Sequence, residues 1–512
     1  MCVRFLAALA CTVICLASAQ VPQPATPTRL VSLQECISLA LSRNLDLQIE
    51  YLNRDVARFQ LSGAYGAFVP TFSFEARHDF VSTPGDYDPD KFNPHFPLEL
   101  NTDSLGPKLS GELPVGLSYE FSALAREDNA RTDFRSDPGD ARNFSDGIRR
   151  TNNYFATTGV SLQQHLLKDF WIDQERQTVL LRRKDVKISA AVLRFQLMKT
   201  VLAVELSYDD LLAARERVRV QEKALELRQQ LVNETRRRVE VGDLPPLDRE
   251  QAETQLENTL TALSAAREAW VTQQNVLKNL LTDNFRQWAD LELAPEDALV
   301  AVPAHLNRAE SALRALEGRP DLQAARLAVE KSDAAVKFRL NQLFPNLDLV
   351  GGYGSVGVDP DSGSAVNQAF SFGYPNYYYG VVLSFPVTDI AGRANYRSSQ
   401  TSRRLAELQL RKAEQEVMLQ IADFVNRATS RFDQAGSTRK ARGYAEAALA
   451  AEQKKLQNGF STSFFVLQLQ ETLTEARTAE VEALVDYNKA LAQLAFAEGS
   501  ILDRNHVTVE IK

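Results

Sequence analysis

The chain contains one helix–proline–strand segment twice, and this repetition constrains the fold more than any other feature. Asp46-Leu47-Gln48 recurs as Asp321-Leu322-Gln323, and Pro70 recurs as Pro345 at the same offset of 275 residues. Proline lacks an N–H to donate and biases the residue before it toward extended backbone, so each proline is predicted to end a helix. Alternating apolar and polar residues follow both prolines, which is the period of a strand. The 512 residues therefore predict one architecture built from two halves.

The two repeats divide the chain into segments with distinct expected structure. We expect a first repeat at 20–282, a linker at 283–318 and a second repeat at 319–512. The expected strands lie at about 70–80, 154–163, 346–354 and 377–386. Charged stretches with regularly spaced Leu, Val and Ala predict helical hairpins at 173–282 and 393–501.

Residues 1–19 have the pattern of a secretory signal peptide. An apolar run from Phe5 to Leu16 precedes the small residues Ala17-Ser18-Ala19, which predicts cleavage between Ala19 and Gln20. A retained membrane anchor is disfavoured because the run is too short to span a bilayer. Cys36 is the only cysteine after this segment, so the mature chain can form no intrachain disulfide. The expected compartment is outside a bacterial inner membrane.

The first expected strand has two different faces. Phe72, Phe74, Ala76, His78 and Phe80 alternate with Ser73, Glu75, Arg77 and Asp79. One apolar and one charged face suit a wall between lipid and water, as in an outer-membrane barrel. A half-buried strand in a soluble sheet explains this single strand equally well.

Residues 81–153 form a polar insertion after this strand, and residues 108–126 within it are expected to form a further hairpin. Two interpretations stay open at this point. The hairpin adds a pair of strands to the barrel, or it decorates the barrel from outside.

The hairpins at 173–282 and 393–501 are predicted to turn at Gly242 and Gly459. A helix over 173–241 would be on the order of 100 Å long, and a helix of that length needs neighbours along it. In the last helix, apolar residues recur at alternating spacings of three and four, with Glu480 as the polar exception. That spacing predicts a coiled-coil seam, although an ordinary antiparallel helical hairpin has the same pattern.

Nothing in the sequence supports an enzyme or a cofactor-binding protein. Gly352–Gly357 fits the pattern GxGxxG, but we expect no phosphate-binding helix after it. The five histidines have no metal-ligand spacing, so no catalytic, metal or cofactor site is predicted. The net charge of −8 argues against nucleic acid as a partner.

Taken in order, these motifs resemble those of the TolC-like outer-membrane efflux protein family. The resemblance rests on the doubled helix–proline–strand segment with Arg319-Pro320-Asp321-Leu322, on Phe385-Pro386-Val387 with Gly392, and on the two glycine turns. It covers about residues 32–501. Each motif is weak alone, but their order and duplication make the resemblance specific.

The resemblance implies a mixed α+β fold, with a long antiparallel α-helical coiled-coil barrel continuous with a trimeric outer-membrane β-barrel. The barrel would have twelve strands, with four or more from each subunit. The implied partners are two further copies of the chain, a periplasmic adaptor, an inner-membrane pump and outer-membrane lipid. The helical part would lie in the periplasm.

The resemblance also places a gate at the helical tips, where family members carry charged residues. Asp248 matches an acidic tip position, whereas Ser461–Gln468 carries no charge, so an ionic lock between the two tips is not expected. Phe465 and Gln468 are the candidates for a ring that narrows the pore. The tip and gate candidates are therefore Gly242, Asp248, Gly459, Phe465 and Gln468.

The predicted function is a passive exit duct for a tripartite efflux or type I secretion system. The alternative is a periplasmic coiled-coil spacer without a pore. The two differ in whether the chain needs detergent for extraction.

Overall fold

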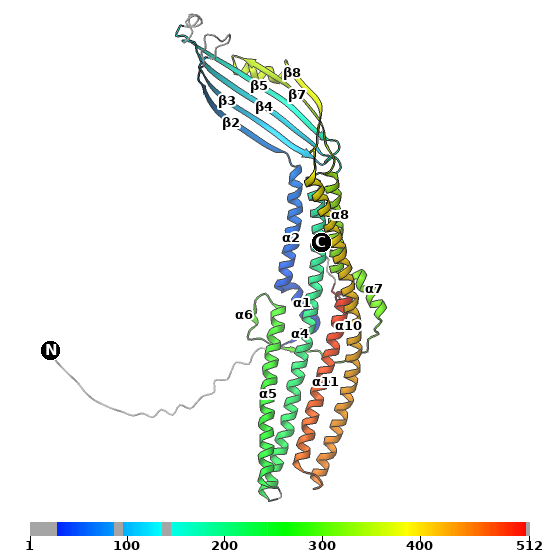
Figure 1. The fold of residues 1–512 in the computed structure, drawn as a ribbon. Helices are drawn as coiled ribbons and strands as arrows, with labels where there is room; N and C mark the ends of the chain where they lie inside the picture. The colour runs from blue at the N-terminus through cyan, green and yellow to red at the C-terminus, as the bar shows by residue number, and fades with distance from the viewer. Residues whose placement is uncertain (1–27, 86–95, 136–144, 243, 508–512) are drawn as a thin grey trace, which may run out of the picture. The chain divides into compact units, whose positions relative to one another are not determined.

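The computed structural model describes residues 28–85, 96–135, 145–242 and 244–507 (Figure 1). The expected signal segment and its cleavage site at Ala19 and Gln20 lie outside these residues. The chain divides into two compact units. The first comprises residues up to 44, 203–302 and 432–489, and the second comprises 45–202, 303–431 and those from 490 on.

The second unit contains a six-stranded antiparallel sheet in the order β2-β3-β4-β5-β7-β8. Its strands lie side by side in Figure 1, each antiparallel to its neighbours. Their bounds are β2 Thr71–Thr83, β3 Leu98–Leu113, β4 Leu117–Asp133, β5 Ile148–His165, β7 Asn346–Asp359 and β8 Pro375–Ser384. The sheet has six strands, which agrees with the expectation of four or more strands per chain. The two additional strands are β3 and β4, which the inserted hairpin forms.

The strands β2 and β7 each begin at the residue after a repeated proline. Upstream of Pro70 lie α2 (Leu45–Ala64) and a 3-10 turn at Tyr65–Phe68. Upstream of Pro345 lies α8 (Pro320–Asn341). Pro320 occupies the first turn of α8, where a missing N–H costs nothing. Both repeats thus pass from helix to strand within a few residues of the proline.

Four long helices account for much of the rest of the described chain. They are α4 (Gln174–Glu240), α5 (Pro246–Leu281), α10 (Ile390–Gln457) and α11 (Ser463–Glu498). Short helices are α1 (Leu33–Arg43), α6 (Phe285–Trp288), α7 (Arg308–Gly318), α9 (Ser362–Phe370) and α12 (Ile501–Arg504). None of the helices among the described residues is long and apolar enough to cross a membrane.

The first unit has a core between α4, α10 and α11. Leu231, Leu449, Val466 and Leu473 are buried together there. Glu480, the polar exception in the expected seam, is also buried, and its carboxylate lies 2.9 Å from the guanidinium of Arg442 on α10. The ion pair explains how a carboxylate is accommodated in an otherwise apolar seam.

The second unit has a separate helical core. Leu322 of α8, Ile421 of α10 and Ala497 at the end of α11 meet there with almost no exposed surface. Small alanine side chains let the helix backbones approach closely at these positions. The expected fold class, mixed α+β with long antiparallel helices, is confirmed.

Several short elements were not expected from the sequence. β1 (Thr28–Val31) pairs in parallel with β6 (Glu292–Pro295), which lies in the expected linker. The expectation of no helix after the GxGxxG segment is wrong, because α9 follows it. Those glycines lie inside β7, and a Cβ on Gly357 would sit 1.9 Å from the carbonyl oxygen of Ala365 in α9. Gly357 is therefore explained by the close approach of α9 to the strand.

Candidate functional site: a two-faced sheet and two helical tips

One face of the six-stranded sheet carries an apolar band that crosses every strand. The directly paired row Phe72, Leu109, Phe121, Val160, Tyr353 and Tyr377 runs from one edge to the other. We define the apolar band as the alternate residues on this face within Phe72–Ala76, Leu105–Leu113, Leu117–Ala125, Ala156–Leu162, Leu347–Tyr353 and Tyr377–Leu383.

The band is exposed on the single chain. Phe72 has 67% and Val381 62% of its surface accessible, and Phe121 has 49%. Soluble monomers rarely leave contiguous apolar patches of this extent in water, so such a patch marks an interaction surface. Since the band follows the alternation of all six strands, it crosses one face of the sheet from edge to edge.

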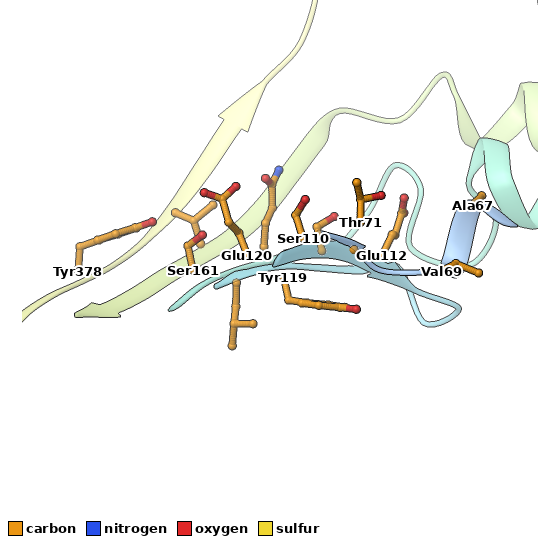
Figure 2. Close-up of a pocket in the computed structure, with 14 residues that line it drawn as sticks. Ala67, Val69, Thr71, Ser110, Glu112, Tyr119, Glu120, Ser161 and Tyr378 are labelled. Atoms are coloured by element: carbon orange, nitrogen blue, oxygen red, sulfur yellow. The ribbon is translucent and has the colours of Figure 1, made fainter. Parts of the chain in front are cut away.

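The opposite face is polar. Thr71, Ser110, Glu120 and Ser161 form a directly paired row on it. Figure 2 shows Ser110 and Glu120 pointing to one side of the sheet and Tyr119 to the other. The polar side chains line a concavity of about 450 Å³. Lys108 and Glu120 on neighbouring strands form an ion pair at 2.7 Å on this face.

The apolar band ends at a polar row on the same face. His78, Asp103, Glu127 and Tyr154 are directly paired there across β2 to β5. His78 Nδ1 lies 2.7 Å from Asp103 Oδ1, and the Tyr154 hydroxyl donates to Glu127 Oε1 at 3.0 Å. The change from apolar to charged side chains fixes one boundary of the band.

Three carboxylates approach one another near the other end of the sheet. Oxygen atoms of Glu112, Asp173 and Glu175 lie within 4.8 Å of one another. Asp173 is neutralised by the guanidinium of Arg176, whose Nε donates to Asp173 Oδ2 at 2.6 Å. Glu112 belongs to β3, whereas Asp173 and Glu175 lie at the start of α4. Because the buried Asp173 carboxylate already has a cationic partner, we assign no ligand to this cluster.

The two helical tips, which lie in the first unit, both contain a glycine in the left-handed conformation. Gly242 has φ +82° after α4, and Gly459 has φ +78° after α10. A side chain at either position would meet no neighbouring atom, so the backbone conformation alone selects glycine. The predicted turns at Gly242 and Gly459 therefore have the same local geometry in the two repeats.

The remaining tip candidates lie on the helices after the turns. Asp248 is in the first turn of α5, a favourable place for a carboxylate. Phe465 and Gln468 are exposed in the first two turns of α11, and Phe465 contacts Phe464 edge-on with ring centroids 5.7 Å apart. Gln468 lines a groove of about 460 Å³ between α11 and α5, together with Leu247 and Phe464.

A buried arginine near these tips was not predicted from the sequence. Arg228 of α4 is buried, and its Nη1 donates to the carbonyl oxygen of Leu467 in α11 at 3.2 Å. Burial lowers the pKa of this guanidinium below its ordinary value. α4 contains several other arginines in similarly charged surroundings. The sequence does not distinguish Arg228 from them, and only the packing of α11 on α4 shows that it is the buried one.

Comparison with known proteins shows that the chain has the fold of outer-membrane channels. Residues 313–500 match the model of the outer membrane efflux protein family. The fold is similar to the CmeC outer-membrane channel of Campylobacter jejuni, with a TM-score of 0.66, 14% identity, and coverage of 92% of this chain and 86% of CmeC. A comparison with curated proteins gave no match.

Two further structures of outer-membrane proteins are also similar. VceC, an outer membrane protein of Vibrio cholerae, matches with a TM-score of 0.66, 17% identity, and coverage of 91% of this chain and 96% of VceC. The MtrE outer-membrane channel of Neisseria gonorrhoeae matches with a TM-score of 0.62, 17% identity, and coverage of 92% and 89%.

The class that these comparisons define is a fold class, the fold shared by outer-membrane channels. Within this fold, residues 313–500 match the outer membrane efflux protein family, and the predicted resemblance to TolC-like proteins is confirmed.

Proposed function

We propose that the protein is an outer-membrane channel that serves as the exit duct of a tripartite efflux or type I secretion system. The observation that carries this proposal is the two-faced sheet. An apolar band crosses all six strands, and the opposite face is charged and concave. Lipid on one side and water on the other is the environment that this alternation suits.

The sheet requires more than one copy of the chain. Among the described residues β2 and β8 each have one unpaired edge. Open edges cannot sit in lipid because their N–H and C=O groups would be unsatisfied. We therefore propose a homotrimer whose sheets join into one barrel, with the helical parts in the periplasm.

The proposed partners act at the helical end. A periplasmic adaptor and an inner-membrane pump would dock there, and the pump would supply the energy for transport. The tip candidates Gly242, Asp248, Gly459, Phe465 and Gln468 would form the entrance. In this proposal the chain catalyses no reaction and conducts substrates passively.

The rival function, a periplasmic spacer without a pore, gives the apolar band no role. Extraction behaviour separates the two. A channel should stay in the membrane pellet after osmotic shock, need detergent for release and migrate as an oligomer that heating dissociates. Release of most of the protein by osmotic shock alone would favour the spacer.

A further inference from the structure

The sheet has two strands more than the four per subunit that the family resemblance implies. β3 and β4 lie between β2 and β5 in both sequence and sheet order. They come from the polar insertion at 81–153, for which the sequence left open whether it joins the barrel wall.

The added strands are fully integrated into the hydrogen-bonded sheet. β2 pairs with β3 from Thr71 to Thr83, and β4 pairs with β5 from Leu117 to Asp133. A hairpin that merely decorated the outside of a barrel would leave β2 paired directly with β5. Here β2 and β5 are separated by two strands along their whole paired length.

The added strands also carry the apolar band over a membrane-spanning length. On β3 the band covers Leu105–Leu113, and on β4 it covers Leu117–Ala125. Each range is nine residues long, and a tilted transmembrane strand needs roughly nine to eleven. The band ends on both strands at the row that includes Asp103 and Glu127, together with His78 of β2 and Tyr154 of β5.

The two free edges of the six-stranded sheet are complementary to each other. Neighbouring strands alternate in direction, and six is an even number, so β8 of one copy and β2 of the next would also be antiparallel. Both edge strands carry the apolar band, with Phe72 and Phe74 on β2 and Tyr379 and Val381 on β8. A second copy of the chain would therefore cover each edge and continue the apolar face.

We infer that three copies of this chain close a single barrel of eighteen strands, a conclusion that rests on the trimer of the proposed function. Barrel diameter grows roughly in proportion to strand number, so this barrel would be about 1.5 times as wide as a twelve-stranded one. Barrels of 16–18 strands leave an aqueous channel. The outer-membrane section would thus admit bulkier polar cargo than a twelve-stranded duct.

Electron cryomicroscopy of the full-length protein, extracted in detergent, tests this inference directly. The expected image has three copies around the axis and eighteen strands in the wall. Twelve strands with the β3–β4 hairpin outside the wall would overturn the inference, as would two copies with twelve strands, and both results would leave the channel function intact. A particle without any barrel would instead overturn the proposed function.

Paired cysteine substitutions give an independent test in intact membranes. Phe121→Cys and Glu120→Cys place thiols on opposite faces of β4, and Val160→Cys and Ser161→Cys do the same on β5. Cys36 is buried, and burial raises the pKa of its thiol to about 12, so it contributes little background.

The eighteen-strand barrel predicts that both strands behave alike. A membrane-impermeant maleimide should label Glu120→Cys and Ser161→Cys at least about tenfold faster than Phe121→Cys and Val160→Cys. If Val160→Cys is protected but Phe121→Cys is labelled as fast as Glu120→Cys, β4 lies outside the wall and the inference is wrong.

Discussion

The guanidinium of Arg319 and the carboxylate of Asp321 form a two-point ion pair at the start of α8. Arg319 Nε donates to Asp321 Oδ1 at 3.0 Å, and Nη2 donates to Oδ2 at 2.7 Å. The same guanidinium donates to Gln420 Oε1 of α10 at 3.0 Å and to the carbonyl oxygen of Ala497 in α11 at 3.3 Å. Arg319 therefore joins three helices of the second unit through one nearly buried side chain.

Replacing Arg319 should destabilise this unit strongly. Arg319→Ala leaves the acceptors on α10 and α11 without their donor, and removing one partner of a buried ion pair costs about 3–5 kcal/mol. Partial exposure of Asp321 places the expected loss near the lower value, about 3 kcal/mol. Denaturant unfolding of the detergent-extracted protein measures it.

Lys337→Ala is the matched control for this experiment. It removes an exposed ion pair with Asp333 on the same helix, which is expected to cost no more than about 0.5 kcal/mol. Equal losses for the two variants would show that Arg319 has no special role in joining the helices.

The tip glycines should be sensitive to a single methyl group. Gly459→Ala forces a residue with a Cβ into φ +78°, at a cost of about 1–2 kcal/mol. Gly436→Ala in α10 also meets no neighbouring atom, but there alanine is favoured by about 1 kcal/mol. Hydrogen exchange should become faster at residues 456–463 in Gly459→Ala and not in Gly436→Ala. Unchanged exchange in both variants would contradict the conformational explanation.

The gate hypothesis predicts that shortening tip side chains widens the pore. Phe465 and Gln468 are exposed on the first two turns of α11, where three copies could form rings. Phe465→Ala and Gln468→Ala should raise single-channel conductance in planar bilayers by about twofold or more, because side-chain rings at a constriction limit ion flow. Tyr444→Ala, an exposed aromatic on α10, is the control that should leave conductance unchanged. Unchanged conductance in both tip variants would exclude them as the constriction.

The turn at Gly459 should loosen in acid. The hydroxyl of Ser461 donates to Glu452 Oε1 at 2.5 Å, and this bond, helped by Lys455, lowers the pKa of the Glu452 carboxyl. A lowered folded-state pKa stabilises the turn above the ordinary carboxyl pKa of about 4.3, and the stabilisation disappears as pH falls through the lowered value.

Hydrogen exchange of the turn measures this effect, once corrected for intrinsic exchange rates. Protection of residues 458–463 should fall as pH drops below about 4 in the natural protein. In Glu452→Gln the protection should be weaker at neutral pH and independent of pH. The same pH dependence in both proteins would show that another group titrates.

Local sequence signals located the features that depend on local backbone chemistry. Proline in the interior of a helix interrupts it, which is why Pro70 and Pro345 were predicted to end helices. Strands begin directly after both prolines. Gly242 and Gly459 adopt a conformation that few other residues tolerate, and the chain turns at both. The functional role of these four positions remains a prediction.

Features that depend on pairing between distant segments could not be predicted from the sequence. The parallel pairing of β1 with β6 joins residues more than 250 positions apart, and neither strand has a distinctive composition. The sequence does not decide whether β3 and β4 join the sheet. A polar hairpin has the same pattern of residues whether it lies within the barrel wall or outside it. Arg442 and Glu480 lie on different helices, so their ion pair became visible only in the packed structure.

The central claim is that this chain forms a water-filled pore through a membrane, and planar-bilayer recording tests it most directly. Purified oligomer should insert from detergent and produce discrete, reproducible conductance steps in symmetric salt. Heat-dissociated protein from the same preparation should produce none. Intact oligomer that inserts into the bilayer but conducts no current, even after the tip substitutions Phe465→Ala and Gln468→Ala, would contradict the account.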